Sequence, residues 1–147
     1  MNKLICAAAM ACASMAVHAA PAKRAMTAND LVMMERVSDP QLAPAGDVVA
    51  YVLRQTDYAA NKGMRSIWLA RLDGKAPQRR LTGGNGNSES PRWSADGQWL
   101  YFMSTRSGSA QVWRMGLAGG EAEQVTDLAM DVGAFRLSPD GARLAFS

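Results

Sequence analysis

The residues of this sequence that could take part in chemistry are serines and aspartates in glycine-rich surroundings. Ser88 lies in the segment GNSES (86–90), one glycine short of the G-x-S-x-G pattern that surrounds a nucleophilic serine. That pattern needs a strand before the serine and a helix after it. Here a Gly/Asn-rich loop precedes Ser88, and Pro91 with a new strand follows it. A loop between repeats explains the segment better than a nucleophile.

Two further sets of residues also lack the surroundings that their possible chemistry would need. TGGNGN (82–87) has the glycines of a phosphate-binding loop, but no lysine follows and no helix N-terminus is expected there. Asp96 and Asp140 each precede a glycine at equivalent positions, so they are expected to stabilise turns rather than act as acids or bases. We therefore predict no catalytic, cofactor-binding or metal-binding residue in this chain, and no cofactor.

The N-terminus has the features of an export signal. Lys3 is followed by the apolar segment Leu4–Val17, and Val17 and Ala19 are small residues in the positions that a signal peptidase recognises. The apolar segment would span about 21 Å as a helix, short of the roughly 30 Å of a bilayer core, which favours removal over a membrane anchor. A lipoprotein would need a better small-residue box before Cys12. We predict a signal peptide over 1–19, a periplasmic or secreted location, and no stable membrane insertion.

Removal of this segment changes the chemistry open to the mature chain. Both cysteines, Cys6 and Cys12, and the single histidine, His18, lie within it. The mature chain then has neither a thiolate nor an imidazole for a metal or for nucleophilic catalysis. The 16 Lys and Arg residues and the 13 Asp and Glu residues are scattered along the chain, which argues against nucleic acid as a partner.

A repeat organises the rest of the chain. RWSADGQWLYFMS (92–104) aligns with RLSPDGARLAFS (136–147), and a weaker copy is QLAPAGDVVAYVL (41–53). The glycines of the three copies, Gly46, Gly97 and Gly141, are 51 and then 44 residues apart, and most of the difference lies in one loop around 55–64. Other residues also correspond between the first two repeats: Trp68 aligns with Trp113, and Thr82 aligns with Thr126. Insertions confined to a loop are typical of repeat architectures.

Each repeat contains four candidate strands separated by turn residues. In the second repeat they are predicted over 91–94, 98–104, 110–117 and 122–126. The S-P-D-G element suits a tight turn, so Leu137 and Leu144 are expected in adjacent strands of one hairpin. Four antiparallel strands in each 40–50-residue repeat predict a β-propeller blade, with a β-sandwich as the alternative. The four tryptophans, at positions 68, 93, 99 and 113, are expected in the core and between blades.

The predicted fold class is therefore all-β: an incomplete β-propeller of two four-stranded blades plus the first hairpin of a third. A short helix over Thr27–Val37 precedes it, with Thr27 and Asp30 approximating a capping box. The predicted domains are 1–19, a segment with the helix over 20–37, and the partial propeller over 38–147, with blades at about 38–89, 90–134 and 135–147. Closed propellers need four to eight blades, so we expect an N-terminal piece of a longer polypeptide, or alternatively a short product that assembles as an oligomer.

Two segments carry a resemblance to a known family. NDLVMMERVSDPQ (29–41), followed by SPRWSADG (90–97), is similar to the N-terminal propeller of secreted bacterial prolyl oligopeptidase-family serine peptidases. Within this family, the sequence motifs are most similar to those of acylaminoacyl-peptidase-like and dipeptidyl-aminopeptidase-like members. The resemblance covers 29–147, although SPDG-type blades also occur in TolB-like periplasmic propellers. Ala45 stands where the family often has aspartate, which predicts a less well-formed first turn.

The resemblance implies a two-domain enzyme. Its propeller would lie over a C-terminal α/β-hydrolase domain of the same polypeptide and restrict entry to short peptide substrates. That domain would carry a Ser-Asp-His triad, and no triad residue has a matching position in this sequence. The alternative is a non-enzymatic, TolB-like periplasmic propeller that binds a protein or peptide partner.

Overall fold

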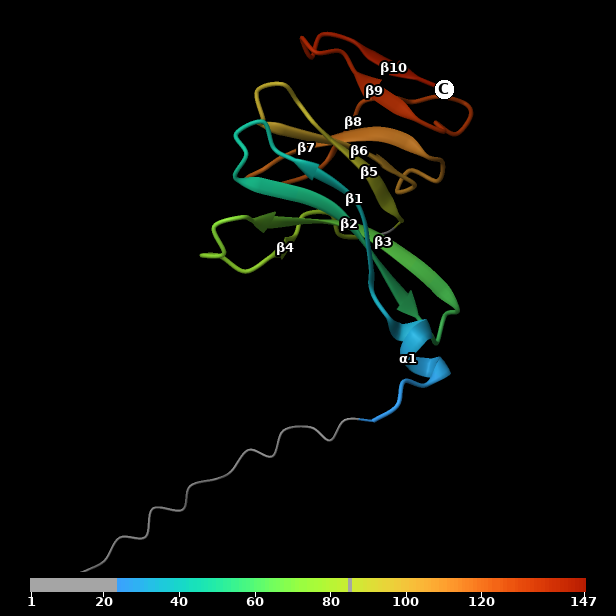
Figure 1. The fold of residues 1–147 in the computed structure, drawn as a ribbon. Coiled ribbons are helices and arrows are strands. Elements are labelled where there is room, and N and C mark those ends of the chain that lie inside the picture. The colour runs from blue at the N-terminus through green and yellow to red at the C-terminus, as the bar shows by residue number, and fades with distance from the viewer. Residues whose placement is uncertain (1–23, 85) are drawn as a thin grey trace, which may run out of the picture.

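The computed structural model describes residues 24–84 and 86–147 of the chain. The predicted signal peptide, with Cys6, Cys12 and His18, lies outside these described residues. Within them, no helix is both long and apolar enough to cross a membrane. What the structure describes is one short helix followed by ten strands in three antiparallel sheets (Figure 1).

Helix α1 (Ala28–Met33) begins with the predicted capping box. The Thr27 Oγ1 accepts a hydrogen bond from the Asp30 amide at 3.3 Å, and the Thr27 amide donates to Asp30 Oδ2 at 2.8 Å. The helix is shorter than the predicted Thr27–Val37, because Met34 is already extended. Val37 belongs to the first strand and pairs with Leu53, so the neighbouring strand supplies the backbone partners that a longer helix would have supplied.

The first two sheets are four-stranded meanders and the third is a hairpin. The first contains β1 (Arg36–Leu42), β2 (Val48–Asp57), β3 (Lys62–Arg71) and β4 (Arg79–Arg80), in that order. The second contains β5 (Ser88–Trp93), β6 (Trp99–Ser104), β7 (Gln111–Gly116) and β8 (Glu123–Gln124). The third contains β9 (Phe135–Leu137) and β10 (Leu144–Phe146). The three sheets stack side by side as blades (Figure 1), which confirms the predicted propeller class.

The hairpin turns confirm the alignment of the three copies. Leu137 pairs with Leu144 as expected. Gly46, Gly97 and Gly141 all have φ near +70°, a conformation that favours glycine. Each glycine amide donates to the carbonyl three residues earlier, at 2.8, 3.0 and 2.9 Å. The expectation that Ala45 weakens the first turn is therefore wrong for the backbone: glycine makes the turn, and the aspartate found in the other copies only adds to it.

The repeat also includes a feature that the sequence did not reveal. The innermost strands β1 and β5 each have a bulge, between Ser38 and Gln41 and between Glu89 and Arg92. In both bulges the residue before a proline has positive φ, 47° at Asp39 and 55° at Ser90. Such values are uncommon for residues other than glycine. The bulges bend both inner strands at equivalent points.

The core lies between the blades. Strand alternation directs Ile67 and Leu69 of the first blade and Leu100 and Phe102 of the second into one shared, solvent-free cluster. A second cluster joins the second blade to the hairpin of β9 and β10; its buried members are Met103, Val112, Val132 and Phe135. Each blade therefore buries apolar side chains against its neighbour, as in a propeller.

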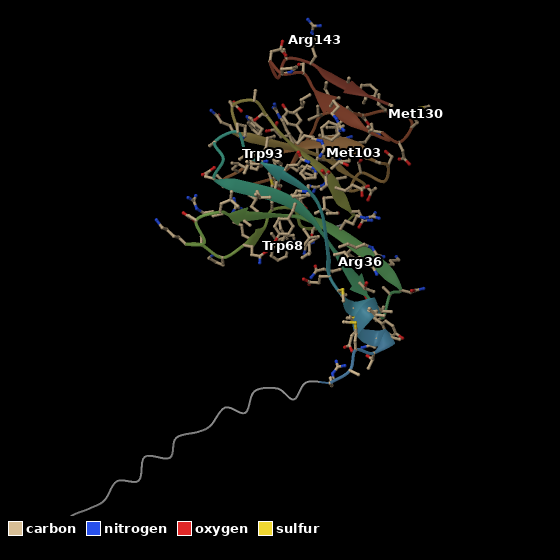
Figure 2. The ribbon with its side chains drawn as sticks, viewed as in Figure 1. Arg36, Trp68, Trp93, Met103, Met130 and Arg143 are labelled. Atoms are coloured by element: carbon tan, nitrogen blue, oxygen red, sulfur yellow. The ribbon has the colours of Figure 1, made fainter. Side chains whose placement is uncertain are left out.

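The tryptophans divide into two pairs. Trp93 and Trp113 pack against the cluster between the first two blades, which confirms the expected inter-blade packing for these two. Trp68 lies between core residues in β3 and therefore faces the side of the first blade away from the second (Figure 2). Trp99 is half-buried on the opposite face of the second blade from that cluster, and the Arg114 guanidinium lies 4.5 Å from its ring centre. Trp68 and Trp99 therefore belong to neither of the two apolar clusters.

Candidate functional site between the first two blades

A cleft of about 400 Å³ lies between the first two blades at the end where their inner hairpins turn. The β1–β2 turn and the loop between β3 and β4 form one wall. Asp96 and Gly97, in the equivalent turn of the second blade, and Leu117 form the other. The side chains lining it are mixed in character; they are Ala43, Ala45, Asp47, Val48, Leu69, Arg71, Ala76, Pro77, Arg79, Asp96 and Leu117. Pockets of this size, partly apolar and with a few charges, bind small ligands or single side chains.

Arg71, on one wall of this cleft, forms ion pairs with nearby aspartates. Arg71 pairs with Asp73 at 3.1 Å and lies 3.9 Å from Asp47. The hydrogen bond to Asp73 raises the pKa of Arg71 and lowers that of Asp73. Arg79 donates to the Leu117 carbonyl and so joins the two walls. The cleft can therefore offer a ligand both charged and apolar side chains.

Asp96 and Asp140 occupy turns, in agreement with the sequence. Asp96 Oδ1 accepts hydrogen bonds from the Ser94 hydroxyl at 2.5 Å and from the Gln98 amide at 3.0 Å. Asp140 makes the same pair of bonds, to Ser138 and to the Ala142 amide. The serine hydrogen bond, followed by the amide, lowers the pKa of both carboxyl groups. Both aspartates therefore remain charged and serve to close the hairpin.

Inner-strand contacts between the blades were missed by sequence reasoning. Arg92 of β5 pairs with Asp39 of β1 at 2.8 Å, and the side-chain Nε2 of Gln41 also donates to Asp39, at 2.6 Å. The Trp93 indole N–H donates to the Gln41 carbonyl at 2.9 Å. Alignment of SDPQ (38–41) with the second blade's ESPR (89–92) could have marked these positions as equivalent, but not as partners. The contacts fix the second blade against the first along their inner edges.

Ser88 and the TGGNGN loop have structural positions. Ser88 begins β5 and is buried; its Oγ lies 3.4 Å from Ser104 Oγ and 3.5 Å from the Arg106 guanidinium. A strand rather than a helix follows it, unlike a nucleophile elbow. Thr82 is fully buried and its Oγ1 accepts from the Ile67 amide at 2.9 Å. Over 24–84 and 86–147, no three His, Cys, Asp or Glu residues are grouped to hold a metal ion.

Comparison with known proteins agrees with this geometry. Residues 20–147 match the PD40 family, described as the TolB beta propeller domain. The uncharacterized peptidase YuxL of Bacillus subtilis is 38% identical over 122 residues, which are 81% of this chain and 18% of YuxL. Dipeptidyl-peptidase 5 of Porphyromonas gingivalis is 30% identical over 122 residues, 83% of this chain and 18% of that protein.

A solved structure gives the same result in three dimensions. The acylaminoacyl peptidase of Pyrococcus horikoshii superimposes with a TM-score of 0.64 at 25% identity, over 78% of this chain and 17% of the peptidase. The chain thus spans under a fifth of the length of these relatives. It is similar both to the propellers of peptidases and to TolB-type propellers.

Proposed function

Because this chain belongs to the TolB β-propeller family, we propose that it forms the first blades of a propeller that gates an exported serine peptidase. In this proposal a C-terminal α/β-hydrolase domain of the same polypeptide supplies the catalytic triad. The propeller blades restrict entry to short peptides. The observation that carries the proposal is the match to two peptidases across 122 residues, including the segment before the first blade.

The role of this chain's own residues is then positional. Asp39, Arg92 and the Trp93 indole hold the inner strands of two blades at a fixed separation. A rigid inner edge keeps the passage along the propeller axis at one width, and a passage of fixed width selects substrates by size. The cleft at the hairpin ends, lined by Arg71 and Asp96, is open to part of a peptide that passes there.

The test uses the full-length polypeptide. We expect it to hydrolyse chromogenic aminoacyl or dipeptidyl substrates, to be blocked by a serine-directed inhibitor, and to leave a denatured protein substrate uncut. The chain of residues 20–147 alone is expected to be inactive in the same assay. Inhibitor-sensitive turnover by the chain alone would contradict the proposal, as would a reading frame that stops after the last blade.

The second candidate is a non-enzymatic propeller that binds a protein or peptide partner in the periplasm. The family match to the TolB beta propeller domain favours it. The two candidates separate on one observation: a downstream hydrolase domain with a G-x-S-x-G motif supports the peptidase, and its absence supports the partner-binding propeller.

A further inference from the structure

Arg106, in the loop between β6 and β7, lies over two aromatic rings. Its guanidinium carbon lies 5.3 Å from the Phe102 ring centre and 5.1 Å from the Trp113 ring centre. The guanidinium donates to two hydroxyl oxygens, those of Ser104 at 3.1 Å and Ser88 at 3.5 Å. Both acceptors are neutral hydroxyl groups. The positive charge of Arg106 therefore has hydrogen-bond partners but no negative counter-charge in the described part of the chain.

Arg106 lacks the carboxylate partner that five other arginines of the described chain have. Arg24, Arg65, Arg71, Arg92 and Arg114 all form ion pairs, whereas Arg106 forms none with any residue of the described chain. Burial lowers the pKa of Arg106 and no neighbouring carboxylate raises it. A guanidinium stays charged in proteins, and a charge that is partly removed from water favours a counter-charge beside it.

A buried donor without an acceptor lies next to Arg106. The Trp113 indole N–H is buried and has no hydrogen-bond partner among the described residues. The equivalent Trp68 donates to Ser66, two residues earlier in its strand. Gln111 stands in the place of Ser66, and its amide is already occupied by Thr126 and by the backbone of 128–130. Within the described residues, the site therefore combines a guanidinium that has no carboxylate partner with one buried donor that has no acceptor.

Arg106 and Trp113 line an open groove of about 430 Å³ between the outer part of the first blade and the second blade. The exposed wall of the groove is more polar than apolar: Leu81, Met115 and Ala122 contribute a smaller apolar part, and the exposed Glu121 also borders it. The backbone beside Arg106 is fixed, because Thr105 and Asn87 exchange hydrogen bonds at 3.0 and 3.1 Å.

Gly86 permits this arrangement. It has φ of +89°, and a Cβ at this position would lie 2.9 Å from the Arg106 amide nitrogen. The loop that carries Arg106 is thus held close to the loop that precedes β5. A donor that is ordered before the ligand arrives loses less entropy on binding.

We propose that this groove binds a carboxylate carried on an apolar body, with Arg106 as the counter-charge and Leu81 and Met115 against the apolar part. A guanidinium fork matches the two oxygens of a carboxylate. A free aromatic acid and the C-terminus of a peptide both offer this chemistry. The inference does not depend on the peptidase proposal, because it uses only contacts within the two blades.

The test titrates the full-length protein with four small-molecule probes and measures their binding by calorimetry or ligand-observed NMR. The probes are 3-phenylpropanoate, its neutral analogue 3-phenylpropanol, N-acetylphenylalanine and N-acetylphenylalanine amide. We expect the acids to bind with a Kd on the order of 1 mM, as suits ligands of this size, and the neutral analogues at least about tenfold more weakly. Binding of 3-phenylpropanoate alone indicates a free acid, and binding of N-acetylphenylalanine as well indicates a peptide C-terminus.

Three variants connect the binding to this groove. Arg106→Gln is expected to weaken binding of the acids at least about tenfold, and Arg143→Gln, at an exposed arginine far along the chain, to change it less than about twofold. Glu121→Gln removes the negative charge at the border and is expected to leave binding unchanged or to strengthen it. Absence of saturable binding to the wild type, equal binding of acids and neutral analogues, or weaker binding by Glu121→Gln would overturn the proposal. The last two readouts decide it even if Arg106→Gln fails to fold.

Discussion

At the scale of single residues, small hydrogen-bond networks set the geometry of the turns. Asp96 and Asp140 each anchor a hairpin through a serine hydroxyl and a backbone amide. The first hairpin has Ala45 in place of the aspartate and forms the same backbone turn. The aspartates thus contribute to stability without being needed for the fold, which makes them good subjects for substitution.

The first prediction concerns Asp96→Ala. Hydrogen bonds lower the pKa of Asp96 below its unfolded value, so its contribution is present above about pH 4 and is lost as the pH falls through the folded pKa. We expect urea unfolding of the full-length variant to show a deficit at pH 7 that shrinks towards about pH 3. Asp127→Ala, at an exposed aspartate outside the turns, is the control. A deficit that does not depend on pH would show that the carboxylate's charge is not what stabilises the turn.

The second prediction concerns the inter-blade ion pair. The Arg92 and Asp39 side chains are 21% and 30% exposed, so removal of the arginine leaves a carboxylate in a partly dry position. We expect Arg92→Met to lower the free energy of unfolding by about 1–2 kcal/mol. Arg65→Met breaks the more exposed pair with Glu89 and is expected to cost less than about 1 kcal/mol. Equal effects in urea unfolding would remove the special role assigned to Arg92.

At the scale of elements, a threonine follows the outer strand of each of the first two blades and plays the same role in both. The outer strands β4 and β8 are only two residues long, and beyond each of them a threonine hydroxyl accepts an amide hydrogen bond from the neighbouring strand, β3 or β7. Thr82 Oγ1 accepts from the Ile67 amide and Thr126 Oγ1 accepts from the Val112 amide, both at 2.9 Å. This contact explains why a threonine recurs 14 residues after Trp68 and 13 residues after Trp113.

The third prediction tests this role of Thr82. Thr82→Val keeps the shape of the side chain but leaves the buried Ile67 amide without its acceptor. We expect it to lower the free energy of unfolding by about 1–3 kcal/mol, and Thr82→Ser, which keeps the hydroxyl, to lower it by clearly less. Chemical denaturation of both variants provides the comparison. A valine variant as stable as the serine variant would show that water or a shifted strand satisfies the amide.

These elements also show what the sequence could predict. The three hairpins and the strands of the second blade were predictable, because turn residues and alternating apolar residues are local features. The end of α1 was not, because pairing of Val37 with Leu53 overrides the local helical pattern. Arg106 and Trp113 are brought together with Leu81 of the other blade only by tertiary packing, and no spacing in the sequence marks that contact.

At the scale of the whole molecule, each blade depends on its neighbours for burial. The first blade shares its core with the second, and the second shares another with the hairpin of β9 and β10. Trp68 and Trp113 are equivalent, and Trp113 faces the preceding blade. By the same register Trp68 faces the position that a preceding blade occupies in a closed ring, where a half-buried tryptophan becomes fully buried.

The last prediction follows from these faces. Expressed alone, residues 20–147 leave the Trp68 face of the first blade open, and Phe146 of β10 is 51% exposed. Open strand edges beside apolar faces favour association, so we expect the isolated chain to bind a hydrophobic dye, to associate in light scattering and to melt without a cooperative transition. The full-length polypeptide is expected to be monodisperse and to melt cooperatively. A discrete oligomer of the isolated chain would favour assembly of short copies into a ring, and a stable, cooperatively melting monomer would show that neighbouring blades are not required.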